Sequence, residues 1–136
     1  NDVSETATPD GFRFEVSASP LGDSQRGARS GRFFTPHGVV ETPAFMPVGT
    51  HASVRGLAMP ELVAAGARMV LANAYHLYLR PGDEMVRALG GVHAFARWDG
   101  PMLTDSGGYQ VFSLSRYRQV DETGVTFKNK LDGSMH

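Results

Sequence analysis

The first part of the chain alternates apolar and polar residues with the period of a β-strand. Residues 12–16 read Phe-Arg-Phe-Glu-Val, and this period of two predicts a half-buried strand. Residues 32–34 and 39–41 flank a turn that contains proline and glycine, which predicts a β-hairpin. Residues 1–11 carry almost no large apolar side chains, so we expect a flexible tail before these strands.

From residue 43 onward, apolar runs of strand length alternate with helical patterns. The runs that predict strands are residues 44–50, 68–75 and 101–104. Helices are predicted between them, over residues 60–66 and 81–89, because proline opens each segment and glycine closes it. This alternation is typical of βαβ units around a parallel sheet.

The pattern becomes weaker after the last of these strands. Residues 125–131 alternate as one more strand and are followed by the turn pair Asp132-Gly133. The chain then reaches His136, and we expect no partner strand to return before it.

These patterns assign the chain to the α/β class and divide it into three parts. The parts are a tail over residues 1–11, antiparallel strands over residues 12–42 and βα units over residues 43–136. Three strand–helix units cannot close a parallel barrel, which takes eight units and typically ~250 residues. The pattern therefore indicates either a small open sheet or a truncated barrel.

Composition narrows the functional classes only slightly. With 41% hydrophobic residues, 20% charged residues and a formal net charge of −1, the chain is not a strongly basic nucleic-acid binder. The sequence has no apolar run near the ~18 residues of a membrane span and no signal-peptide pattern, so we expect a cytoplasmic protein without membrane contact. It has no cysteine and its five histidines lack metal-ligand spacing, which predicts no metal site here.

The segment after the third predicted strand is the richest in chemistry. Loops at the carboxyl ends of parallel strands carry the active site in this architecture. Asp105 supplies a carboxylate that can exchange protons, and Gly107 and Gly108 let a flat ligand approach the backbone. Tyr109 offers a ring on which a base can stack. Together these residue types suit recognition of a nucleobase that is held out of its helix.

A purely structural interpretation of the same residues stays open. Asp105 can cap the segment that follows it while the glycines form a turn and Tyr109 packs in the core. Asn73 and His76 follow the neighbouring strand and either face the same cavity or serve as a cap and a hydrogen-bonded structural residue. Spacing alone favours the structural interpretation.

Several segments taken together resemble one enzyme family. In chain order they are residues 35–38 (TPHG), 42–50 (TPAFMPVGT), 73–77 (NAYHL), 79–82 (LRPG), 98–100 (WDG), 103–110 (LTDSGGYQ) and 122–127 (ETGVTF). Their collinear order resembles the tRNA-guanine transglycosylases, or queuine tRNA-ribosyltransferases, from about residue 26 to the C-terminus. The resemblance implies the N-terminal portion of a TIM barrel preceded by an antiparallel hairpin, with the barrel incomplete in this chain.

The resemblance also implies a reaction. A carboxylate attacks the ribose of the tRNA wobble nucleotide, guanine leaves, and a 7-deazaguanine base, queuine or its precursor, replaces it. In that chemistry Asp105 is the acid/base residue that also binds the base, and Tyr109 stacks on the base. Ser106, Gly107 and Gly108 complete the base pocket, with Asn73 in its wall or supporting shell. The resemblance further implies a homodimer for the intact enzyme.

Two departures from the family pattern are visible. Ala74 stands where the family usually has threonine. The resemblance implies that the nucleophilic aspartate, further base-binding residues and a Cys/His site for Zn²⁺ lie in sequence downstream of this chain. We therefore expect the chain alone to be inactive. Two other hypotheses are a non-catalytic short paralogue that binds tRNA or an active partner, and an unrelated hydrolase that pairs Asp105 with His76.

Overall fold

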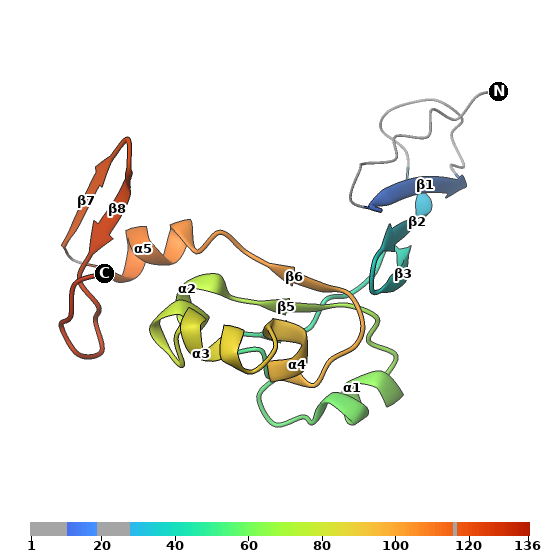
Figure 1. Cartoon of the computed structure of the whole chain (residues 1–136). Helices are drawn as coiled ribbons and strands as arrows, with labels where there is room; N and C mark the ends of the chain where they lie inside the picture. The colour runs from blue at the N-terminus through green and yellow to red at the C-terminus, as the bar shows by residue number, and fades with distance from the viewer. Residues whose placement is uncertain (1–10, 19–27, 116) are drawn as a thin grey trace.

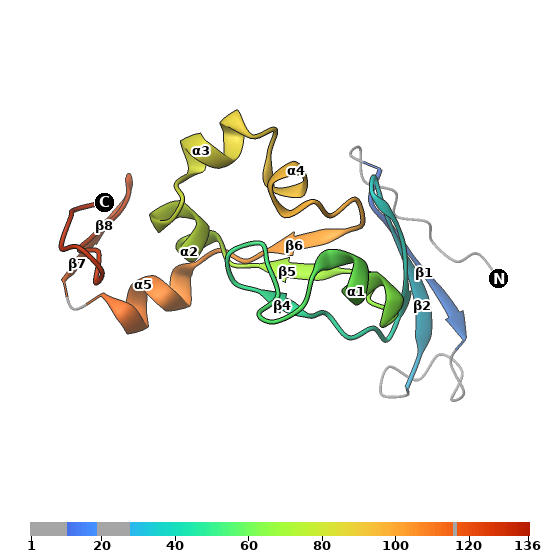
Figure 2. The same ribbon diagram turned by 90° about the horizontal axis from the view of Figure 1, so that it is seen from below.

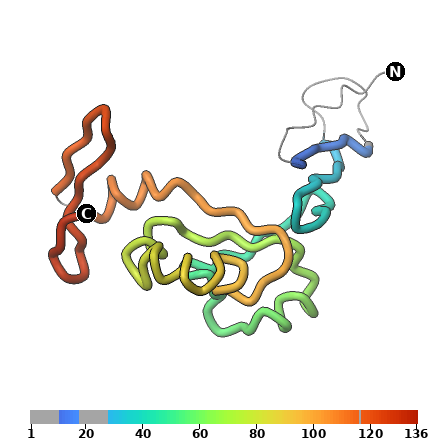
Figure 3. Tube along the Cα trace, viewed as in Figure 1, coloured from blue at the N-terminus to red at the C-terminus, as the bar shows by residue number. Residues whose placement is uncertain are grey.

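The computed structural model describes residues 11–18, 28–115 and 117–136. Nearly all of the predicted tail therefore lies outside the described residues. Within the described residues, the strands form three sheets of three, three and two strands. Figure 3 shows that the first sheet and the last lie at opposite ends of the molecule, with the helical middle part between them.

The first sheet is antiparallel and contains the residues of the predicted hairpin. It consists of β1 (Arg13–Ala18), β2 (Ser30–Thr35) and β3 (Gly38–Thr42), in that spatial order. Phe33 pairs with Val40 across β2 and β3, and the Val40 side chain is 2% exposed. The chain turns between them at Pro36 and His37, as the proline and glycine of this segment favour.

The second sheet is parallel and is surrounded by short helices. Its strands are β4 (Val48–Gly49), β5 (Val70–Ala72) and β6 (Met102–Thr104), with β5 in the middle. The helices between them are α1 (Met59–Ala64), α2 (Ala74–Leu79), α3 (Asp83–Ala88) and α4 (Val92–Ala96). Figures 1 and 2 show how these helices follow the strands, and the fold of this part is mixed α/β.

The core lies between the middle strand and the helices. Val70 and Ala72 of β5 are fully buried, because both lie on the face of the strand that packs against the helical segments. Val70 packs with Leu62 of α1 and with Trp98, which is 4% exposed. The Trp98 indole N–H donates to the Pro101 carbonyl at 2.9 Å, so burial and a hydrogen bond together fix the segment that leads into β6.

Several sequence-based element boundaries were wrong. Within the strand expected over residues 44–50, only Val48 and Gly49 pair with a neighbouring strand. Phe45 is 84% exposed and lies outside the sheet. The strand expected over residues 68–75 ends at Ala72, since α2 begins at Ala74. Helices α2, α4 and α5 (Gly108–Leu114) were not predicted, because none of them opens with the proline that marked residues 60–66 and 81–89.

The C-terminal segment was also predicted wrongly in one respect. β7 (Arg118–Asp121) pairs antiparallel with β8 (Gly124–Phe127). The chain then returns through a turn, and Phe127 and His136 exchange backbone hydrogen bonds of 2.8 and 2.9 Å. A returning partner therefore exists, although it is too short to show an alternating pattern.

Among the described residues, no helix combines the length and the apolar character that crossing a lipid bilayer requires.

Candidate functional site

Asp105 follows β6 directly and its carboxylate reaches the neighbouring strand end. One oxygen, Oδ1, accepts a hydrogen bond from the Ala74 backbone N–H at 2.8 Å. The other, Oδ2, accepts from the side-chain amide of Asn73. The Asp105 backbone N–H donates to the Ala72 carbonyl at 3.3 Å. Two contacts thus hold the carboxylate, and a third holds the Asp105 backbone, at the carboxyl ends of β5 and β6, where parallel α/β folds place their sites.

Asn73 contributes to the local fold and to the position of Asp105. It is 6% exposed and is the N-cap residue of α2, where its side-chain oxygen accepts from the His76 backbone N–H at 3.1 Å. Because the oxygen is used by the cap, the amide nitrogen is free to donate to Asp105. Asn73 therefore caps α2 and contacts Asp105 at the same time.

The structural interpretation of the Asp105 segment is wrong in two of its parts. Asp105 does not cap the helix that follows it, since the N-cap of α5 is Gly107 and carries no side-chain cap bond. The bonds that the Asp105 carboxylate makes to described residues go to the start of α2 instead. Tyr109 is not a core residue either, because it is 78% exposed.

Gly107 brings the turn after β6 into direct contact with α2. Its φ is +70°, and a Cβ built there would lie 3.0 Å from the Tyr75 Cβ and 3.1 Å from the Tyr75 backbone nitrogen. Only glycine fits both the left-handed backbone and this approach. Tyr75 is 5% exposed beneath the turn, and burial raises the pKa of its hydroxyl.

The sequence-predicted residues differ in how they face solvent. Ser106, Gly108 and Tyr109 are exposed, whereas Asn73 and Gly107 are buried and Asp105 is half-buried. The Gly108 backbone N–H donates to the Ser106 hydroxyl at 3.4 Å. The arrangement therefore presents one supported carboxylate with a hydroxyl, a backbone segment and an aromatic ring open beside it.

His76 lies near this carboxylate without a hydrogen bond to it among the described contacts. Burial lowers the pKa of His76, and the charge of His51 lowers it further, while Asp105 opposes the shift. The His51 and His76 rings meet edge to face, with centroids 5.5 Å apart. Sequence reasoning had not placed His51 near the site, because it follows a different strand and has no spacing signal.

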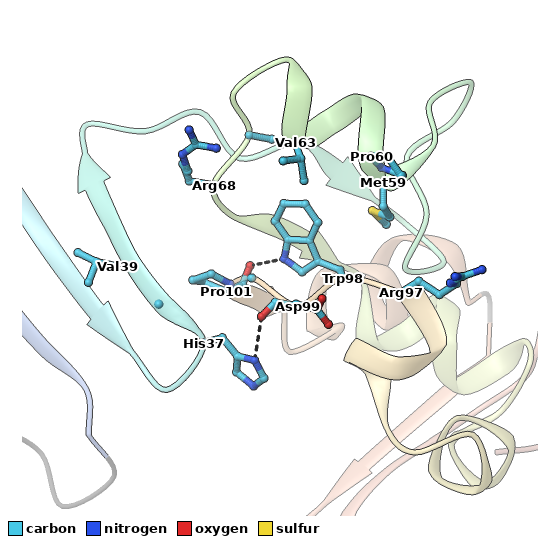
Figure 4. Close-up of a pocket in the computed structure, with 13 residues that line it drawn as sticks. His37, Val39, Met59, Pro60, Val63, Arg68, Arg97, Trp98, Asp99 and Pro101 are labelled. Carbon is cyan, nitrogen blue, oxygen red and sulfur yellow. Dashed lines mark hydrogen bonds between the residues drawn. The ribbon is translucent and has the colours of Figure 1, made fainter.

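A separate cleft of about 370 Å³ lies between the hairpin turn, α1 and the segment before β6. Figure 4 shows Trp98 and Pro101 on one wall, with Arg68 and Arg97 at its edge. His37 Nδ1 lies 3.1 Å from the Asp99 carbonyl oxygen there. None of the sequence-predicted site residues lines this cleft. Its chemistry is therefore distinct from that of the Asp105 segment.

The described residues contain no group of three His, Cys, Asp or Glu side chains that could hold a metal ion. The chain has no cysteine at all. The Cys/His donor set that the family resemblance implies for zinc therefore does not fit these residues.

The chain was compared with protein families and with curated proteins. Residues 23–136 match the family model described as "Queuine tRNA-ribosyltransferase". A curated queuine tRNA-ribosyltransferase of Thermus thermophilus is 59% identical over 126 residues, which are 93% of this chain and 31% of that protein. The corresponding protein of Pelotomaculum thermopropionicum is 58% identical over 84% of this chain and 31% of its own length.

A third relative, the queuine tRNA-ribosyltransferase of Desulforudis audaxviator, is 56% identical over 93% of this chain and 33% of its own length. The chain thus spans about a third of the length of the curated relatives that it matches. The family match covers β6, whose end carries Asp105, and the other two strands of the parallel sheet. This chain belongs to the queuine tRNA-ribosyltransferase family.

Proposed function

We propose that these residues are the N-terminal part of a pentosyltransferase that exchanges guanine at the wobble position of tRNA for a 7-deazaguanine base. The observation that carries the proposal is the Asp105 carboxylate, which Asn73 and the Ala74 N–H hold at the end of β6. Family membership supports the reaction class, because the relatives bear that enzyme's name.

Each residue has a role in this proposal. Asp105 accepts hydrogen bonds from the base and moves protons, since each of its oxygens keeps acceptor capacity beyond the one hydrogen bond that it accepts from Asn73 or Ala74. Tyr109, whose ring is exposed, stacks on the base. Ser106, Gly107 and Gly108 line the base pocket, and Asn73 supports it from below.

The exchange proceeds in two steps that balance. An aspartate from outside the present residues forms a bond to the ribose C1′ while the bond from C1′ to guanine breaks, and protonated Asp105 gives the departing guanine a proton. The incoming base then attacks C1′, the aspartate leaves, and Asp105 takes the proton of that base. The residue thus returns to its starting state.

In this proposal, the remaining parts of the barrel and of the active site come from outside residues 1–136. The chain spans about a third of its relatives' length, which supports a TIM barrel that further βα units close, with the nucleophile and the zinc ligands among them. We propose that the intact enzyme is a homodimer and that residues 1–136 alone do not turn over.

The test is incorporation of labelled guanine into tRNA by the full-length protein. We expect incorporation by the unaltered protein and its loss, by at least about a hundredfold, in Asp105→Ala, because the proton transfer step loses its group. Asp99→Ala is the matched control, since Asp99 is an exposed aspartate outside the site, and it should keep full activity.

The proposal fails if Asp105→Ala incorporates guanine at the same rate as the unaltered protein. A full-length protein that binds tRNA but never incorporates guanine would instead favour the non-catalytic paralogue.

A further inference from the structure

A polar groove lies at the far end of α5 from Asp105 and is not part of the site described above. Its volume is about 570 Å³. It is lined by Ser113, Leu114, Tyr117, Lys128, Asn129, Lys130 and Gly133. Figures 1 and 2 show that this part of the chain, around β7 and β8, lies beyond the carboxyl ends of β5 and β6.

The backbone around this groove is held by a set of partly buried hydrogen bonds. Ser115 is 3% exposed, and its hydroxyl lies within hydrogen-bond distance of the carbonyl oxygens of Tyr117 and Lys128. Asn129 is 4% exposed, and its side-chain oxygen accepts from the Leu131 backbone N–H at 2.9 Å. The Lys128 N–H donates to the Tyr117 carbonyl at 3.1 Å. The groove is therefore a fixed feature of the fold.

The groove collects both lysines of the chain. Among the 13 basic residues of the sequence, Lys128 and Lys130 are the only lysines, and both line it with exposed side chains. Neither ammonium group forms an ion pair or a hydrogen bond within the described residues. Two unpaired positive charges on one rigid groove favour an anionic ligand.

Asp132, the acidic residue nearest to the two lysines in the sequence, forms its hydrogen bonds within its own turn. Asp132 Oδ1 accepts from the Ser134 N–H at 3.0 Å and from the Ser134 hydroxyl at 2.6 Å. These hydrogen bonds lower the pKa of Asp132, so it remains charged but is not paired with a lysine. The positive charge of the groove is offset only in part.

Helix α5 sets the separation between the groove and the catalytic carboxylate. It begins directly after Gly107 and has seven residues, which corresponds to a length of about 10 Å. A polyanion whose reacting nucleotide lies at Asp105 can therefore reach the groove with a neighbouring part of the same strand.

We propose that the Lys128–Lys130 groove binds backbone phosphates of the substrate RNA next to the nucleotide that enters the Asp105 site. This inference rests on the proposed function and adds the surface that positions the RNA. Phosphate contacts from lysine fix the register of a nucleic acid on a protein without reading its sequence. They suit an enzyme that must hold one nucleotide in place while its base is exchanged.

The test is the affinity of the full-length protein for an anticodon stem-loop RNA, measured by fluorescence anisotropy over a range of salt concentrations. The variant Lys128→Gln/Lys130→Gln should bind on the order of tenfold more weakly at low salt, and its slope of log affinity against log salt should fall by about 1.4. Lys128→Arg/Lys130→Arg should restore binding. The control Arg87→Gln removes an exposed charge on α3 and should change neither quantity.

The outcomes separate this inference from the proposed function. Unchanged affinity and salt slope in the glutamine variant would overturn the groove while leaving base exchange untouched. Equal weakening by Arg87→Gln would overturn it too, since the effect would then be one of net charge alone. Absence of guanine incorporation by the unaltered protein, with the lysine effect intact, would overturn the proposed enzyme and leave an RNA-binding surface.

Discussion

Gly107 has a backbone conformation and a close neighbour that only glycine permits. Its φ of +70° is a backbone state that side chains rarely adopt, and a Cβ there would meet the Tyr75 backbone at 3.1 Å. The sequence predicted a glycine turn after the third strand. It did not indicate which surface the turn approaches, because Tyr75 is distant in the chain.

Gly107→Ala should destabilise the protein more than a matched glycine substitution in open space. We expect a loss of about 1–3 kcal/mol in the free energy of unfolding beyond that of Gly56→Ala. Gly56 also has a positive φ, of +81°, but no atom lies within 4 Å of a Cβ built there. Urea unfolding of the full-length variants measures the difference. Equal losses would mean that the contact with Tyr75 has no energetic weight.

Asp105 shows the limit of residue-level prediction from sequence. Its type and place at a strand end marked it as a candidate, but spacing alone favoured a cap of its own helix. Its partners, Asn73 and Ala74, are 32 and 31 positions away in sequence. That pairing depends on the parallel alignment of β5 with β6, which no local pattern contains.

Helix α2 is the element that positions Asp105. Ala74 is its first residue and stands where the family resemblance implies threonine, yet the bond to Asp105 comes from the backbone N–H. The substitution to alanine therefore keeps this contact. The apolar run over residues 68–75 had predicted a strand through Tyr75, because burial on both faces conceals the start of a short helix.

Ala74→Pro should remove the hydrogen bond without breaking the helix. Proline is favoured at the first helical position, and Asn73 already has the extended φ of −97° and ψ of 115° that a residue before proline adopts. Loss of a bond to the carboxylate should lower kcat for base exchange by about tenfold or more. Ala74→Ser keeps the N–H and is the control.

Circular dichroism shows whether the Ala74→Pro variant is folded, and so distinguishes loss of the contact with Asp105 from loss of folding. A folded Ala74→Pro variant with unchanged kcat would show that this contact does not position Asp105 for the reaction.

Across the whole molecule, the antiparallel sheet meets the helical part through two stacked imidazole rings. His37 of the hairpin turn and His93 of α4 have ring centroids 3.7 Å apart and planes within 6° of parallel. Burial lowers the pKa of His93, the charge of His37 lowers it further, and the Gly100 carbonyl and Asp99 oppose the shift. His93 Nε2 is buried without a hydrogen-bond partner among the described atoms.

This pair predicts a loss of stability in acid. A histidine whose pKa is lowered by folding binds more protons in the unfolded state, so its contribution is complete above the unfolded value of about 6.5. It is lost as the pH falls from there through the lowered value. The melting temperature of the unaltered protein should therefore fall between pH 7.5 and pH 5.5 by more than that of His93→Phe. Parallel pH profiles would contradict this account.

The three strands of the parallel sheet were the part of the fold that the sequence predicted best. Apolar runs and their spacing predicted three strands joined by helices, and β4, β5 and β6 are such strands. The returning C-terminal segment and the lysine groove were not predicted. Both depend on contacts of Ser115 and Tyr117 with Lys128 and of Phe127 with His136, which no local sequence pattern contains.

The central claim is that Asp105 and its neighbours form the site for the exchanged base. A crystal structure of the full-length protein with a bound 7-deazaguanine base tests it most directly. The account predicts the polar edge of the base within about 2.6–3.2 Å of the Asp105 carboxylate, with its ring stacked on Tyr109. A base bound elsewhere, with Asp105 still turned only toward Asn73 and Ala74, would contradict it.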